Sequence, residues 1–130
     1  MNHWKLRVVQ LVTALPGVPM LLNAISFIFT PAQATESLGM PMLEGLGRST
    51  QLGDFTSFFV VSAGCIFYGA WKRNATYLQL AALLLAVAAA GRMLAWQAHG
   101  ADFASAFIVF ELISAIWLVV GGRLLQSSRL

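Results

Sequence analysis

Two charges of opposite sign, Arg92 and Glu111, interrupt apolar stretches of this sequence, "AAAGRMLAW" (88–96) and "FIVFELISAIW" (107–117). A charge within a membrane costs at least about 2.5 kcal/mol and normally faces the inside of a helix bundle, paired or hydrated. A third charge, Asp54, opens another apolar stretch. When two carboxyl groups share one guanidinium, one can stay ionised while the other keeps a proton, which makes an acid/base pair. Such a pair suits epoxide opening, double-bond isomerisation or polyene cyclisation.

We therefore predict an intramembrane acid/base enzyme of the epoxide hydrolase, isomerase or cyclase type. Its catalytic residues would be Asp54, Arg92 and Glu111, with the two carboxyls as acid and base and the arginine as an electrostatic clamp. Which carboxyl takes which role stays open. The substrate would be a lipophilic small molecule with one polar group, because it enters from the lipid. The predicted substrate-binding residues are Asn23, Ser26, Ser57, Trp96 and His99.

The same charges also suit a packing salt bridge in an accessory or structural subunit of a membrane complex. A small transporter is a further alternative. Small multidrug exporters also have four helices and one membrane glutamate, but theirs lies in the first helix. Here no charge lies between Arg7 and Glu36, which disfavours transport.

The sequence indicates neither a metal nor another cofactor. His3 and His99 fall at opposite ends of the predicted bundle, and no HxxxH, ExxH or CxxC spacing occurs. No glycine-rich phosphate motif is present, and Cys65 has no second cysteine to pair with. The net charge of +3 could suggest nucleic acid, but no basic run exceeds Lys72-Arg73. We therefore expect no nucleic-acid partner.

The elements that position these residues follow from composition. The 130-residue chain is 58% hydrophobic and 10% charged, whereas soluble domains average roughly a quarter charged residues. Continuous apolar runs long enough to cross a bilayer predict helices, because each helix satisfies its own backbone hydrogen bonds. We predict one all-α domain, residues 1–130, a bundle of four antiparallel transmembrane helices at about 8–29, 55–71, 76–97 and 103–125.

Two interruptions qualify this arrangement. Pro16 and Pro19, in "LPGVP", predict a kink inside the first helix because proline lacks a backbone donor. A long outer loop, 30–53, joins the first two helices. Its apolar residues between 40 and 46 are compatible either with a short interfacial helix or lid, or with an ordered loop.

Charge distribution predicts topology. Six of the eight basic residues fall at one set of helix ends: Lys5, Arg7, Lys72, Arg73, Arg123 and Arg129. The positive-inside rule then places both termini in the cytoplasm and the protein in a cell inner membrane. Counting residues from the turns puts Asp54, Arg92 and Glu111 at one depth in the outer leaflet, with Asn23 and Ser26 near that level.

Small residues recur on the predicted third helix at Ala81, Ala88 and Ala95, a spacing that allows close helix packing and places Arg92 inside the bundle. Four short helices leave little room for a private pocket, which is compatible with a homo-oligomer.

The stretch "GRMLAWQAHGADFASAFIVFE" (91–111), preceded by "GDFTSFF" (53–59), resembles a family of small bacterial four-helix membrane proteins classified as a domain of unknown function. The matching positions are Asp54, Gly91-Arg92, Gly100 and Glu111, and the resemblance covers roughly residues 50 to 125. It implies the four-helix fold and no particular activity.

Overall fold

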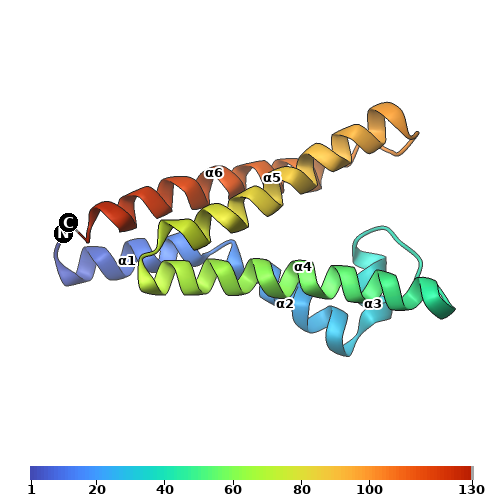
Figure 1. Ribbon diagram of the computed structural model, residues 1–130, viewed down its shortest axis with the longest axis horizontal. Coiled ribbons are helices and arrows are strands. Elements are labelled where there is room, and N and C mark those ends of the chain that lie inside the picture. Colours follow the sequence, from blue (N-terminus) through green and yellow to red (C-terminus); the bar gives the residue numbers. More distant parts are fainter. Residues whose placement is uncertain (130) are drawn as a thin grey trace.

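The computed structural model describes residues 1–129, which form helices joined by short connections and contain no strand (Figure 1). The helices are α1 (His3–Ala14), α2 (Gly17–Phe29), α3 (Pro31–Ser37), α4 (Gly45–Lys72), α5 (Ala75–Ala98) and α6 (Ser105–Ser127). The all-α prediction is confirmed.

Three helices, α4, α5 and α6, are each long and apolar enough to cross a membrane. The pair α1 and α2 meets the same test when taken together, but it is bent by 44° at the short break between Ala14 and Gly17. Residues 1–129 thus contain three candidate spans, or four if the bent pair counts as one. This composition indicates a membrane protein.

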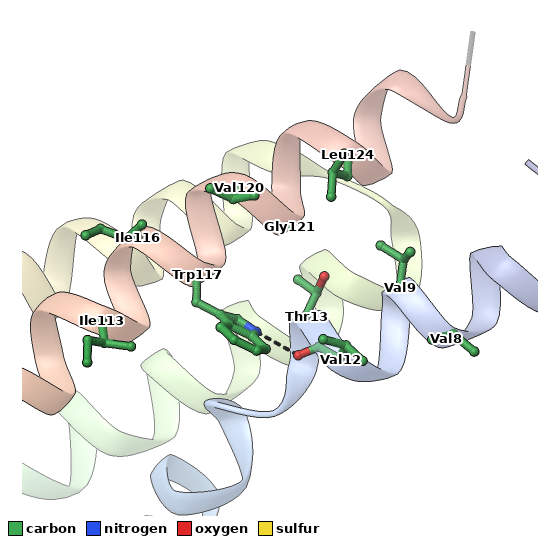
Figure 2. Close-up of a pocket in the computed structure, with 10 residues that line it drawn as sticks. All are labelled: Val8, Val9, Val12, Thr13, Ile113, Ile116, Trp117, Val120, Gly121 and Leu124. Atoms are coloured by element: carbon green, nitrogen blue, oxygen red, sulfur yellow. Dashed lines mark hydrogen bonds between the residues drawn. The ribbon is translucent and has the colours of Figure 1, made fainter.

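The predicted kink in the first apolar segment is present, and a tryptophan compensates for it. In an unbroken helix the carbonyl of Val12 would accept from the backbone N–H of residue 16, which proline lacks. The indole Nε1 of Trp117 on α6 donates to this carbonyl at 2.7 Å (Figure 2). Because Pro16 has no N–H to donate, the Val12 carbonyl can accept from Trp117, and this hydrogen bond joins the break to α6.

The predicted outer loop, 30–53, is wrong over much of its length. It begins with α3, and α4 starts at Gly45, ten residues before the predicted second helix. Polar and glycine-rich composition suggested a loop, but this first part of α4 is helical and holds the preceding segment. The Gln51 side chain accepts from the backbone N–H of Leu43 at 2.9 Å and donates to the carbonyl of Pro41 at 3.1 Å. The stretch from 40 to 44 is an ordered non-helical segment, so the interfacial helix is not formed there.

The helices converge at one end of the molecule and separate at the other (Figure 1). The start of α1, the end of α6 and the α4–α5 turn lie at the convergent end, where α1 also packs against α6. Toward the other end, the hairpin of α5 and α6 diverges from α2, α3 and α4. The buried core between the helices includes the fully enclosed side chains of Ile66, Leu78, Leu85, Leu118 and Leu125.

Candidate functional site

An ion pair joins α5 to α6. The Nε atom of Arg92 donates to Oε1 of Glu111 at 2.5 Å, and this is the one salt bridge found within residues 1–129. The two helices form a hairpin, so residues on either side of the turn reach the same level. The contact between these two side chains agrees with the depth predicted from the sequence.

The surroundings of the pair are unequal. The Glu111 side chain is 6% exposed and the Arg92 side chain 33%. The guanidinium lies over the ring of Phe107, with its carbon 4.4 Å from the ring centre, an attractive cation–π geometry. Phe107 and Glu111 are four residues apart on α6, so they share one face of that helix. Arginine is therefore positioned both by charge and by an aromatic ring.

Half of the Glu111 carboxyl group has no partner. Its Oε2 atom is buried and forms no hydrogen bond within the described chain. Leaving a buried polar atom unsatisfied costs about 1–3 kcal/mol, more when the group is charged. A buried atom of this kind marks a place where a ligand, water or proton would be accommodated.

A cavity of about 330 Å³ lies against this pair. Its walls come from α2, the α3–α4 connection, α4, α5 and α6, and consist of Pro19, Met20, Asn23, Leu38, Phe58, Phe59, Leu85, Ala88, Arg92, Ala106, Phe107, Phe110 and Glu111. Only Asn23, Arg92 and Glu111 among these are polar. An apolar cavity with a few convergent polar groups is the usual form of a small-molecule site.

Asn23, one of the predicted substrate-binding residues, lines the cavity from α2, and its role in binding stays a prediction. Its amide nitrogen donates to the carbonyl of Pro19 at 2.8 Å. This bond fixes the side chain next to the broken part of the first segment. The amide oxygen accepts no hydrogen bond from residues 1–129 and is free to accept one from a ligand.

Asp54 does not join the pair. It is exposed on α4 and lines a different cavity, formed with the segment around Met40 and Leu43. The predicted three-charge cluster is thus two charges in this structure. The reason is the distance between the helices. Because α4 diverges from α5 and α6 at this end (Figure 1), residues predicted at equal depth do not come together.

The remaining predicted substrate-binding residues lie away from the cavity. The Ser57 hydroxyl donates to the carbonyl of Asp54 at 2.8 Å, and the hydroxyls of Ser26 and Thr30 lie 3.2 Å apart. The exposed Trp96 ring packs on Phe103, with centroids 4.9 Å apart. His99 ends α5 and is also exposed. None of these four predicted residues lines the cavity beside Arg92.

Sequence analysis did not identify the aromatic wall of the site, which includes Phe58, Phe107 and Phe110. The four-residue spacing from Phe107 to Glu111 is the one sequence signal that could have indicated part of this aromatic wall. No three His, Cys, Asp or Glu side chains meet as a metal site would require anywhere in residues 1–129.

A larger groove of about 500 Å³ lies between α1 and α6 (Figure 2). Apart from Thr13 and Trp117, its lining is aliphatic or glycine. It contains no titratable group and is separate in its lining from the ion pair. We therefore take the smaller cavity, beside Arg92 and Glu111, as the candidate site.

Comparison of the chain with models of protein families, with curated proteins and with solved structures found no match. The resemblance to small bacterial four-helix membrane proteins therefore stays a prediction. Fold and cavity together describe a small all-helical protein with three to four helices that could span a membrane and one charged, mostly apolar site.

Proposed function

We propose that this protein is an intramembrane acid/base enzyme that acts on a lipophilic small molecule in the cavity beside Arg92 and Glu111. One observation carries the proposal: Arg92 and Glu111 line the same mostly apolar cavity, and the buried Oε2 atom of Glu111 has no hydrogen-bond partner in the described chain. A purely structural pair would be more stable with both carboxyl oxygens satisfied.

The pair suits a proton-shift isomerase better than the other reactions considered. With Asp54 elsewhere, the cavity has a single carboxyl group. Glu111 would accept a proton from the carbon next to a substrate carbonyl, and return it to another carbon of the conjugated system. Arg92 would stabilise the negative oxygen that forms between these two steps. The double bond moves, the proton balance is zero, and no second reactant is needed.

The cavity walls indicate the shape of such a substrate. The volume of the cavity lies near the lower end of the roughly 300–1,000 Å³ typical of small-molecule sites. Aromatic side chains, including Phe58 and Phe107, would pack against an apolar body. The Asn23 amide would add one hydrogen bond to a polar substituent. An unsaturated ketone of bicyclic size fits these requirements.

The membrane arrangement is part of the proposal. The bent pair α1 and α2 would form one broken span, which gives four spans with α4, α5 and α6. The basic residues gathered at the convergent end favour a cytoplasmic location for both termini, in a bacterial inner membrane. Arg92 and Glu111 would then lie in the outer half of the bilayer, where substrate arrives from the lipid.

A structural role is the second candidate, and a specific observation favours it. The ion pair joins α5 and α6, which are already neighbours through a short connection. A salt bridge that only stabilises helix packing in an accessory subunit would have this arrangement. A charge exchange separates the two candidates. Arg92→Glu combined with Glu111→Arg restores an ion pair but reverses the charge at each position.

The test is isomerisation of a β,γ-unsaturated bicyclic ketone by the full chain in proteoliposomes, followed by absorbance of the conjugated product and by deuterium uptake from D₂O. Glu111→Gln should lower turnover by about 10²–10⁴, the usual contribution of a general base. Glu36→Gln, an exposed carboxyl outside the cavity, is the matched control. The charge exchange should keep thermal stability and lose turnover. Full turnover in Glu111→Gln would contradict the proposal that Glu111 is the general base of an enzyme.

A binding measurement tests the same site without turnover. A lipophilic phenol resembles the negative intermediate, so the wild-type chain should bind it and Arg92→Met should bind it at least tenfold more weakly, an effect of the size expected for one charge-assisted hydrogen bond. Equal binding by both proteins would leave Arg92 without its proposed role.

A further inference from the structure

The convergent end of the molecule contains a basic cavity of about 410 Å³. The ion pair lies toward the other end of α5 and α6. The cavity is formed by the start of α1, the α4–α5 turn and the end of the described chain. Its lining residues are His3, Leu6, Arg7, Gln10, Trp71, Lys72, Arg73 and Arg129. Four of these are arginine or lysine side chains, and none is acidic.

The cations of this cavity have no protein counter-charge in the described residues. Within residues 1–129 the one salt bridge joins Arg92 to Glu111, at the other end of α5. The five acidic residues of the sequence are Glu36, Glu44, Asp54, Asp102 and Glu111, and none lines this cavity. Several like charges around one concave surface repel each other unless an anion lies among them.

Contacts hold the cavity in shape. The guanidinium of Arg7 lies over the Trp71 ring, 5.7 Å from its centre. The Gln10 side chain donates to the carbonyls of Ala70 and Trp71 at 3.1 and 3.0 Å. These carbonyls form the partly negative C-terminus of α4, which would repel an anion, and the amide reduces that repulsion. Arg73 ends the helix in the left-handed conformation, with φ of 53°.

An apolar groove of about 620 Å³ continues from this cavity between α1 and α4. The two share Arg7, Gln10 and Trp71, so they meet along one wall. The rest of the groove is lined by Leu11, Ala14, Phe67 and Tyr68. A ligand that uses both surfaces must have an anionic head directly joined to an apolar chain.

We infer that this end of the molecule binds one anionic phospholipid, with its phosphate among the cations of the basic cavity and an acyl chain along the α1–α4 groove. Basic pockets between membrane helices bind anionic headgroups in this way. Free phosphate would use the cations alone and leave the groove unfilled. The site shares no residue with the Arg92–Glu111 cavity, so it stands independently of the proposed enzyme.

The experiment uses the full chain, extracted from vesicles of equal parts phosphatidylglycerol and phosphatidylcholine, and counts retained lipids by native mass spectrometry. The wild-type chain should retain one phosphatidylglycerol in preference to phosphatidylcholine. Arg7→Gln combined with Lys72→Gln should retain it roughly tenfold less. Lys5→Gln combined with Arg123→Gln is the matched control, because it removes the same charge from the start of α1 and the end of α6, at residues that do not line the cavity.

Two outcomes would overturn the inference. Equal retention of both lipids by the wild-type chain would show that no anion is selected. Equal loss in the cavity variant and in the control would show general attraction of a basic surface to acidic lipid. Melting temperatures of both variants identify any loss that follows from unfolding, and Lys72→Gln alone then repeats the comparison with a smaller perturbation.

The groove is tested separately. Leu11→Asn should weaken retention of phosphatidylglycerol, whereas Leu22→Asn should not, because Leu22 on α2 is also exposed (62%, against 71% for Leu11) but lies outside the groove. Glycerol phosphate has the same head without the chains. If it displaces the retained lipid as well as added phosphatidylglycerol does, the ligand is a soluble phosphate and the inference of a lipid site is wrong.

Discussion

The two ends of the molecule differ in how closely the helices approach. At the convergent end, a Cβ atom built at Gly121 on α6 would lie 2.5 Å from the Thr13 hydroxyl, and one at Gly69 would lie 2.8 Å from Leu78. Toward the divergent end, a Cβ at Gly91 or Gly53 would meet no heavy atom within 4 Å. The first pair of glycines sets helix separation, and the second pair does not.

This difference explains where the ion pair and its cavity lie. At the convergent end the charged side chains line the basic cavity and are mostly exposed, whereas the divergence of the helices opens the cavity that Arg92 and Glu111 line. Large rings such as Phe59 and Phe107 fill part of the wedge between the helices. The candidate spans therefore pack closely at one end and leave a cavity beside the ion pair at the other.

Removing one partner of the ion pair should have the largest effect on stability. Arg92→Ala leaves the Glu111 carboxyl buried without its one ionic partner, and we expect the free energy of unfolding to fall by about 3 kcal/mol, at the lower end of values for buried pairs because Arg92 is a third exposed. Unfolding of the chain in mixed micelles by increasing denaturing detergent measures this.

Removing both charges is the control. Arg92→Met combined with Glu111→Leu keeps the approximate volume and removes the buried charge, so its stability should return to within about 1 kcal/mol of the wild-type chain. If the double variant is as unstable as Arg92→Ala, the ion pair itself holds the divergent end together, which would favour the structural candidate.

A glycine exchange tests the convergent end, with a smaller expected effect. Gly121→Ala places a methyl group against Thr13, where backbone or side chain must shift, and should cost about 2 kcal/mol. Gly91→Ala, one residue before Arg92, enters open space and should change stability by less than about 0.5 kcal/mol. The same detergent titration compares them. Equal costs at both glycines would mean that the two ends do not differ in packing.

The sequence predicted the features that depend on position along a helix. The predicted helices at 76–97 and 103–125 agree closely with α5 and α6, because continuous apolar runs bounded by polar turns define them. Pro16 predicted the bend. Counting from the turn placed Arg92 and Glu111 at one level, and their helices are adjacent because the connection is short.

Features that depend on lateral position were not predicted. The start of α4 at Gly45 was missed because its first turns are polar and rich in glycine, and the Gln51 contacts that hold the preceding segment come from the fold. Counting from the turn predicts the same depth for Asp54 as for Arg92, yet depth does not determine how far apart two helices lie. Helix divergence arises from side-chain volumes on facing surfaces, which one sequence does not reveal without the packing.

Asp54→Asn should have the smallest effect and therefore tests this lesson most sharply. The residue is exposed, lines a different cavity and forms no ion pair within residues 1–129. Like other surface substitutions away from special features, Asp54→Asn should change the unfolding equilibrium constant and the isomerase turnover by no more than about twofold. Turnover is measured beside Glu111→Gln in the proteoliposome assay, and stability is measured by the detergent titration. A large loss of turnover with normal stability would mean that α4 closes onto α5 and α6 during the reaction. The three charges would then meet in a state other than the one described, and the divergent end would be a site that closes rather than a fixed wedge.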